Sequence, residues 1–338
     1  MFRAEPPLAT QRTALVILGM HRSGTSSLAG LVSRLGCDLG DDLLEANEWN
    51  PLGYGEHREV VERHDALLRT LGLSWDSARA PDPESAAVRA TEVDFVALLE
   101  RDFVDSALLA LKDPRLCRFL PLWRRVFDAT GIDARYVLML RHPLEIAASL
   151  ARRDDLGLAK SLLLWAGHVI AAERETRGER RAFVDYAGLM SDWRGTAEQL
   201  GEALGLRWPI ELDSAANDVE SYLTPDLRHH STPAWPDDTA QRFPWAIRLH
   251  EALARVARAD DPDARAAIDS VAADWSAAAA LYEPELAEAD AALSQARADT
   301  READRARQKA ERKVSQLADS PSVWLRTFLR RRLRGNQP

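Results

Sequence analysis

Cysteine is scarce in this sequence. The 338 residues include two cysteines, Cys37 and Cys117, which are too few to form the disulfide framework of a small secreted protein. Neither cysteine has a second thiol or clustered histidines beside it at the spacing of zinc ligands. We therefore expect no metal site, and the shortage of cysteine fits the reducing environment of the cytoplasm.

Signals for export and membrane insertion are also missing. No segment approaches the roughly 20 consecutive apolar residues that a membrane-spanning helix needs. The first 11 residues lack the apolar core of a signal peptide. We therefore expect a protein that is made and kept inside the cell.

The sequence has no surplus of basic charge. Its formal net charge is -9 and its isoelectric point is about 5.5, whereas proteins that bind nucleic acids in general carry an excess of Lys and Arg that neutralises phosphates. We expect no nucleic-acid partner, and any basic site must be local. Hydrophobic residues make up 46% of the chain, which is enough to enclose a sizeable core.

Four short apolar runs predict buried strands, because each is too short for a typical helix and is bounded by strand-breaking residues. They cover residues 13–19, 107–111, 135–140 and 181–184. Stretches with helical periodicity follow or separate them, at residues 26–35, 59–71, 121–129, 144–152 and 160–176. This alternation predicts an α/β fold, a three-layer sandwich with a central parallel sheet. Ligands in such folds bind at the carboxyl ends of the strands.

The pattern changes after about Pro233 to helix-prone sequence rich in Ala, Arg, Asp and Glu. We therefore expect a main domain over residues 1–232, with its core at 13–190, and a C-terminal helical extension. That extension divides into a peripheral helical region (233–280), a long helix with weak heptads (281–320) and a basic tail (321–338).

The heptads of the long helix are weak because their seam is mostly alanine. The two tracks are Leu286, Leu293, Thr300, Arg307 and Val314, and Ala289, Ala296, Ala303, Ala310 and Leu317. A solvated helix and a homo-oligomer contact both fit this seam. The tail interleaves five arginines with apolar residues and has no acid, so it fits either an interfacial helix at an anionic membrane surface or a disordered basic segment.

The first predicted strand ends in a hydroxyl-rich turn that contains glycine and opens directly into a predicted helix. It consists of Gly19, Met20, His21, Arg22, Ser23, Gly24, Thr25, Ser26 and Ser27. Unpaired backbone N–H groups and the positive end of the helix dipole stabilise an anion at such a position. The turn departs from the Walker A pattern, because Arg22 precedes Gly24 and no lysine follows a glycine.

A second set of anion-binding residues follows the third predicted strand. Arg141 stands at the carboxyl end of this strand, and Pro143 sets the start of the next helix. Ser149 lies further along that helix. Arg141 and Ser149 are therefore expected to face the same crevice as the loop around Arg22.

With these two motifs in this order, the sequence resembles the sulfotransferases that use 3′-phosphoadenosine 5′-phosphosulfate (PAPS) and have a P-loop NTPase-like fold. The resemblance implies that the loop residues hold the 5′-phosphosulfate, and these are Arg22, Ser23, Gly24, Thr25 and Ser26. It also implies that Arg141 and Ser149 hold the 3′-phosphate. Arg228 loosely matches the loop that closes over the donor.

Two further segments resemble bacterial members of the same family. One is Asn50-Pro51-Leu52-Gly53-Tyr54-Gly55-Glu56, followed by Trp75-Asp76, and the other is Leu111-Lys112-Asp113-Pro114-Arg115. The resemblance extends from about Leu15 to Tyr186. We expect Glu56 to remove the proton of the acceptor, and Lys112 and Arg22 to stabilise the bridging oxygen as it leaves.

Each of these side chains also has a structural interpretation. Glu56 lies in a loop rich in Gly and Pro, where carboxylates are commonly solvated or assist a helix N-cap. Lys112 follows an apolar strand at the edge of the sheet where ligands bind, and an unpaired ammonium group is unfavourable there. We therefore favour contact of Lys112 with an anion over a salt bridge to Asp113. His21 is the second candidate base by residue type, although its place in the loop favours contact with donor or acceptor.

Arg115 and Trp165 also have two interpretations each. Arg115 pairs either with a carboxylate of the acceptor or with Asp113, and the sequence does not separate these roles. Trp165 shares a helical apolar face with Leu162 and Val169, so we place it in the core rather than against an adenine ring.

The resemblance implies in-line transfer of a sulfuryl group from PAPS to a hydroxyl or amine of a glycan, glycolipid or small metabolite. Lysine, arginine and backbone N–H groups suffice to neutralise the few charges involved, so we predict no magnesium requirement. A nucleotide-dependent kinase of the P-loop class is the alternative enzyme, although the Gly-Lys-Ser/Thr lysine is missing. A non-catalytic scaffold, held at a membrane surface by the C-terminal helix and basic tail, is the third alternative.

Overall fold

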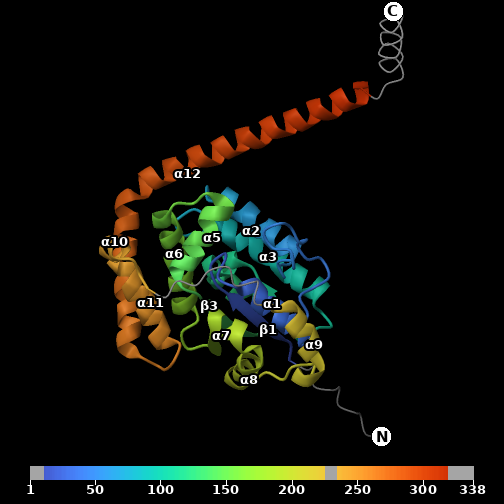
Figure 1. Ribbon diagram of the computed structural model, residues 1–338, viewed down its shortest axis with the longest axis vertical. Helices are drawn as coiled ribbons and strands as arrows, with labels where there is room; N and C mark the ends of the chain where they lie inside the picture. Colours follow the sequence, from blue (N-terminus) through green and yellow to red (C-terminus); the bar gives the residue numbers. More distant parts are fainter. Residues whose placement is uncertain (1–10, 225–233, 319–338) are drawn as a thin grey trace, which may run out of the picture. The chain divides into compact units, whose positions relative to one another are not determined.

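A computed structural model of the chain describes residues 11–224 and 234–318 (Figure 1). The chain forms two compact units, Met1–Glu283 and Pro284–Pro338. Arg228 and the predicted basic tail lie outside the described residues. No single helix in the described part of the chain has the length and apolar composition of a membrane span.

A parallel four-stranded sheet forms the centre of the first unit. Its strands are β1 (Thr13–Leu18), β2 (Leu108–Lys112), β3 (Asp133–Leu140) and β4 (Arg181–Asp185). They lie in the order β2-β1-β3-β4, and Thr13 at the start of β1 pairs with Leu108 and Asp133. The four predicted strands are confirmed, with ends shifted by at most two residues. β1 is buried along its whole length, as expected for an apolar strand in the middle of a parallel sheet.

Helices cover both faces of this sheet. Those before β3 are α1 (Thr25–Arg34), α2 (Arg58–Thr70), α3 (Ala86–Asp102), the 3₁₀ helix η1 (Pro114–Arg118) and α4 (Leu120–Thr130). Those between β3 and the gap at residue 225 are α5 (Pro143–Asp154), α6 (Leu158–Glu175), α7 (Tyr186–Ser191), α8 (Trp193–Leu204) and α9 (Leu212–Tyr222). The five predicted helical stretches correspond to α1, α2, α4, α5 and α6.

The alternating side chains of β1 separate two cores. Val16 and Leu18 pack with residues of α2, α3 and α4, such as Phe95 and Trp123. Leu15 and Ile17 pack on the opposite face with residues of α1, α8 and α9. The predicted three-layer α/β architecture with a central parallel sheet is therefore confirmed.

A third core lies around α6. Trp165 of α6 is buried there, as the sequence predicted, against α5 and the helices that follow residue 233. The helices after residue 233 are α10 (Asp237–Arg242), α11 (Pro244–Val256) and α12 (Pro262–Ala318), and this core includes residues of α11 and of the first turns of α12. Figure 1 shows α11 beside α6, and Leu249 of α11 and Ile268 of α12 are among the buried residues. The oligomer contact proposed for the alanine seam of α12 stays a prediction.

Candidate active site

The amino end of α1 is open to an anion. β1 leads into a tight loop, and Gly24 occupies the N-cap of α1 in the left-handed conformation, with φ 94°. No side chain caps this end, and the first turn contains no acidic residue. The first N–H groups of a helix have no partner within the helix, so they and the helix dipole favour a negatively charged ligand here.

Glycine at position 24 permits a close approach to Tyr186. A Cβ atom on Gly24 would lie 2.2 Å from Cδ2 of the Tyr186 ring. Tyr186 begins α7 directly after β4, and the guanidinium carbon of Arg141 lies 4.3 Å from the centre of its ring. Tyr186 therefore joins the loop between β1 and α1 to Arg141, a role that the sequence did not predict.

Arg22, Arg141 and Ser149 meet although they are far apart in sequence. Arg141 Nη1 donates a hydrogen bond of 3.0 Å to the backbone oxygen of Arg22, and Arg22 Nε donates one of 2.7 Å to Ser149 Oγ. Arg141 Nε also contacts Glu145 at 2.9 Å. Burial lowers the pKa of Arg22, and the charges of Arg153 and Arg141 lower it further. A bound anion would relieve this concentration of positive charge.

Arg22 contacts both predicted parts of the site. The sequence placed its side chain at the phosphosulfate end and Ser149 at the 3′-phosphate end, and the two side chains are hydrogen-bonded to each other. The Arg22 backbone has φ 68°, a left-handed conformation that residues other than glycine rarely adopt. Such strain persists where surrounding contacts impose it, and it often marks functional loops.

Lys112, Glu56 and Ser26 form a second polar cluster beside α1. Lys112, the last residue of β2, donates hydrogen bonds to Glu56 Oε1 and, at 3.2 Å, to Ser26 Oγ. Asn50 Nδ2 also donates to Ser26 Oγ at 3.2 Å. Glu56 and Lys112 are each 5% exposed. Burial raises the pKa of Glu56, and the adjacent Lys112 partly opposes this effect.

A buried network supports the end of β2. His64 Nε2 accepts a 2.9 Å hydrogen bond from Trp123 Nε1, so His64 must donate from Nδ1 to Asp113 Oδ2, 2.7 Å away. Arg115 contacts Asp113 at 3.0 Å and Asp65 at 2.8 Å. Burial by itself raises the pKa of Asp113, but Arg115 and His64 hold it well below its usual range. Asp113 thus binds Arg115 and His64, while Lys112 binds Glu56.

Two adjoining pockets open on these residues. The first, of about 120 Å³, is lined by the α1 loop and by Lys112 and Arg141. The second, of about 210 Å³, is lined by Trp75, Leu44, Val61, Arg115 and Asp154. Both are also lined by His21, Tyr54, Glu56 and Arg153. The shared residues therefore form a boundary at which two ligands would meet.

His21 lies at this boundary and Ser23 lies in the loop between β1 and α1, and each has a buried polar atom. His21 Nε2 and Ser23 Oγ have no hydrogen-bond partner among the described residues. Burial lowers the pKa of His21 well below its ordinary value, and Arg115 and Arg153 add to this effect, so its imidazole is neutral at physiological pH. Every candidate residue of the described chain thus lies in or beside the two pockets, apart from Ser149, which is joined to them through Arg22.

Comparison with known families identifies the family of this chain. A model described as the sulfotransferase family matches residues 14–209, which is more than half of the chain. The chain belongs to the sulfotransferase family. The matched segment includes the candidate residues from His21 to Ser149, and sulfuryl transfer is the reaction that its family performs.

Three solved structures are similar to this chain at low sequence identity. The sulfotransferase domain of the olefin synthase of Synechococcus is 20% identical, with a TM-score of 0.41 over 75% of this chain and 98% of that one. The sulfotransferase domain of the curacin biosynthetic pathway is 15% identical, with a TM-score of 0.40 over 70% and 97%. A sulfotransferase of Mycobacterium tuberculosis is 16% identical, with a TM-score of 0.37 over 69% and 76%. No protein of curated function matches the sequence significantly.

Proposed function

We propose that this sulfotransferase uses PAPS as its donor, with Glu56 as general base, and that its acceptor is a hydroxyl or amine of a saccharide, glycolipid or small metabolite. The convergence of Arg22, Arg141 and Ser149 at the amino end of α1 carries the proposal. Arg141 and Ser149 lie 119 and 127 positions from Arg22 and still contact it. Two motifs that are separate in the sequence therefore converge, which supports a single ligand with two anionic ends.

The donor side of the site fits a molecule with two anionic ends. PAPS, when bound, supplies the sulfuryl group and a bisphosphate leaving group. Ser26 Oγ accepts from both Lys112 and Asn50, which leaves its own proton to donate to a phosphosulfate oxygen. Arg141 and Ser149 are assigned to the 3′-phosphate. The N–H groups at the start of α1 bind the 5′ end without rearrangement.

Glu56 and Lys112 have separate roles, since Glu56 accepts a proton and Lys112 stabilises negative charge. Glu56 faces both pockets, so it can take the proton of an acceptor hydroxyl that enters from the Trp75 side. Lys112 contacts Glu56 and Ser26 together, and its ammonium group is placed to stabilise negative charge on the leaving oxygen. The raised pKa of Glu56 brings it nearer to neutral pH, whereas the lowered pKa of His21 makes its imidazole a weaker base.

Replacement of the base tests this division of roles. Glu56→Gln is expected to reduce kcat by about 10²- to 10⁴-fold, while His21→Asn should have a smaller effect. The dissociation constant of adenosine 3′,5′-bisphosphate should stay within a few-fold of wild type in both variants. Unchanged turnover of Glu56→Gln would reject Glu56 as the base.

The donor is tested by calorimetric titration without divalent cations. Adenosine 3′,5′-bisphosphate should bind tightly in the presence of EDTA, and transfer from PAPS should be insensitive to added magnesium. Magnesium-dependent binding of ATP, with no affinity for the bisphosphate, would support the alternative P-loop kinase. Labelled PAPS added to an extract of the producing cells then identifies the acceptor from the product that becomes labelled.

A further inference from the structure

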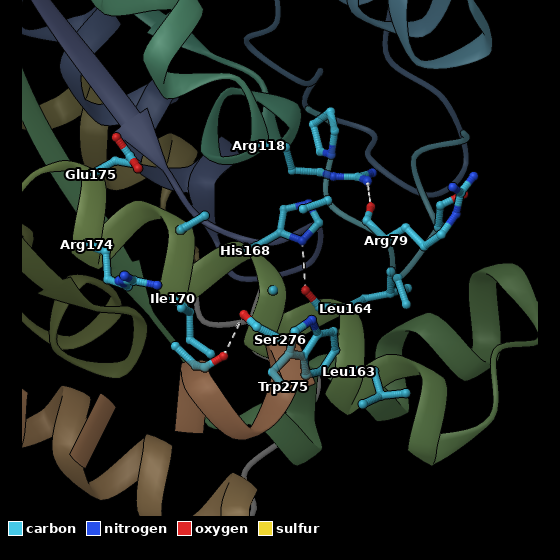
Figure 2. Close-up of a pocket in the computed structure, with 17 residues that line it drawn as sticks. Arg79, Arg118, Leu163, Leu164, His168, Ile170, Arg174, Glu175, Trp275 and Ser276 are labelled. Carbon is cyan, nitrogen blue, oxygen red and sulfur yellow. Dashed lines mark hydrogen bonds between the residues drawn. The ribbon is translucent and has the colours of Figure 1, made fainter. Parts of the chain in front are cut away.

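A third cavity lies between α6, the first turns of α12 and the segment after Trp75 (Figure 2). Its volume is about 280 Å³, while a cavity of about 150 Å³ is enough to hold benzene. The lining is mostly apolar and includes Leu163, Leu164, Ile170 and Trp275. The cavity therefore has room for a molecule with two fused rings.

His168 lines this cavity and carries a hydrogen-bond acceptor without a partner among the described residues. The imidazole is 2% exposed, and its Nδ1 lies 2.7 Å from the backbone oxygen of Leu164 (Figure 2). A carbonyl oxygen only accepts, so Nδ1 must carry the proton. Burial lowers the pKa of His168 to about 3, which keeps the ring neutral and leaves a lone pair on Nε2. This atom is buried and has no partner among the described residues.

Gly167 leaves space beside His168. It lies in the interior of α6 and lines the cavity, and a Cβ atom built on it meets no other atom within 4 Å. Glycine is unfavourable in a helix interior compared with alanine, and no close approach of another segment requires it here. The missing side chain widens the cavity.

The charged side chains of the lining already have protein partners. Arg174 pairs with Asp269 at 3.5 Å and Glu175 with Arg124 at 3.4 Å. Arg118 donates to the backbone oxygen of Ser74 at 3.0 Å, and Arg79 to that of Gly72 at 3.1 Å. An occupant therefore needs no charge of its own, and the unsatisfied group that it meets is a neutral acceptor.

We propose that this cavity is a second binding site for a small, neutral, mainly apolar molecule of about two rings, which donates one hydrogen bond to His168 Nε2. The site is separate from the sulfuryl-transfer site, because the residues that line it do not line the other two pockets. It lies close to that site, since the rings of His168 and His21 are 6.4 Å apart. The proposal does not depend on the identity of the sulfuryl donor.

Indole and 1-methylindole test the hydrogen bond, because they have similar shapes and only indole carries an N–H donor. Neither has a hydroxyl group to be sulfated. Calorimetric titration of the full-length protein should show indole binding on the order of ten-fold more tightly than 1-methylindole, as expected for one hydrogen bond to a buried acceptor. His168→Phe should reduce this ratio to about one.

Gly167 supplies a pair of variants that test the location. Gly167→Leu should fill the cavity and abolish indole binding, while Gly167→Ala should keep it and raise the melting temperature. Both should bind adenosine 3′,5′-bisphosphate like the wild type, which shows that the fold and the transfer site are intact. The proposal is overturned if the wild type binds neither indole nor 1-methylindole, if it binds both equally, if His168→Phe keeps the preference for indole, or if Gly167→Leu binds indole as Gly167→Ala does.

Discussion

Lys112 lies between the proposed acceptor and donor parts of the site. Its ammonium group contacts Glu56 on one side and Ser26 on the other. Removal of Lys112 would leave the Glu56 carboxylate buried without its cation, which is unfavourable, while Ser26 would keep its hydrogen bond from Asn50. Removal of Lys112 therefore mainly affects the ionisation of Glu56, which can be measured as a change in the pH dependence of activity.

The pH profile of kcat/KM is expected to have an acid limb above 4.5, the ordinary pKa of a glutamate, because burial raises the pKa of Glu56. Only the ionised carboxylate accepts a proton, so activity falls as the pH decreases through this raised pKa. Lys112 opposes this increase in the pKa of Glu56. In the Lys112→Met variant, the acid limb of the remaining activity should therefore lie at higher pH. A limb at or below 4.5, or one that Lys112→Met leaves in place, would contradict the assignment.

Gly24→Ala should disrupt the proposed donor site through two effects. The left-handed backbone disfavours any residue with a Cβ atom by about 1–2 kcal/mol, and here the new atom also overlaps the Tyr186 ring. Gly131→Ala is the matched control, because Gly131 has φ 64° and open space around it. Chemical denaturation should show a larger loss of stability for Gly24→Ala, and only this variant should lose affinity for adenosine 3′,5′-bisphosphate. Equal behaviour of the two variants would refute the tight contact.

The candidate residues that the sequence revealed belong to local motifs. The loop around Arg22 and the pair Arg141 and Ser149 are recognisable because a strand, a turn and a helix follow one another along the chain. Tyr186, Arg153 and His168 stand in no such motif, and their surroundings arise from tertiary packing. The first position after a strand was the one signal that could have identified Tyr186.

At the scale of secondary-structure elements, all four strands deliver site residues at their carboxyl ends. β1 runs into the loop of Arg22, β2 ends at Lys112, and β3 is followed by Arg141. β4 is followed by Tyr186. This arrangement agrees with the general rule that ligands bind at the carboxyl ends of parallel strands. The site therefore depends on interactions that hold each strand end in place.

Asp113 anchors the end of β2, so Asp113→Asn is expected to destabilise the fold by about 3 kcal/mol at neutral pH, because it breaks a buried charge network. The folded-state pKa of Asp113 lies below its unfolded value of 3.8. Its stabilising contribution is therefore complete above that value and is lost as the pH falls below it. Urea denaturation at pH 7 and pH 3 should show a smaller difference between wild type and Asp113→Asn at pH 3. A constant difference would contradict this role.

Strands and amphipathic helices were predictable because the period of their apolar residues matches their geometry. α3 was not predicted, although its buried residues Val88, Phe95 and Leu99 share a face. The apolar periodicity of α3 is weak in the sequence, because alanines and charged residues surround these positions. The 3₁₀ helix η1 depends on Asp113 as its N-cap, and such a short turn has no periodic signal.

At the scale of the whole molecule, the described site residues all belong to the unit Met1–Glu283. Deletion of residues 284–338 should therefore leave kcat and the affinity for adenosine 3′,5′-bisphosphate within about two-fold of wild type. Steady-state kinetics on purified protein checks this expectation. Loss of function on deletion, together with normal function of Arg141→Ala, would instead support a scaffold held by the C-terminal helix.

In the proposed function, the residues around Arg22 and Arg141 hold the two ends of one doubly phosphorylated adenosine. Calorimetric titration with adenosine 3′,5′-bisphosphate and adenosine 5′-monophosphate, on wild type and Arg141→Ala, tests it most directly. The wild type should prefer the bisphosphate by about 10- to 100-fold, as expected for charged hydrogen bonds to the 3′-phosphate. Arg141→Ala should lose this preference while its affinity for the monophosphate is nearly unchanged. A preference that survives in Arg141→Ala, or an equal loss of affinity for both nucleotides, would contradict the claim.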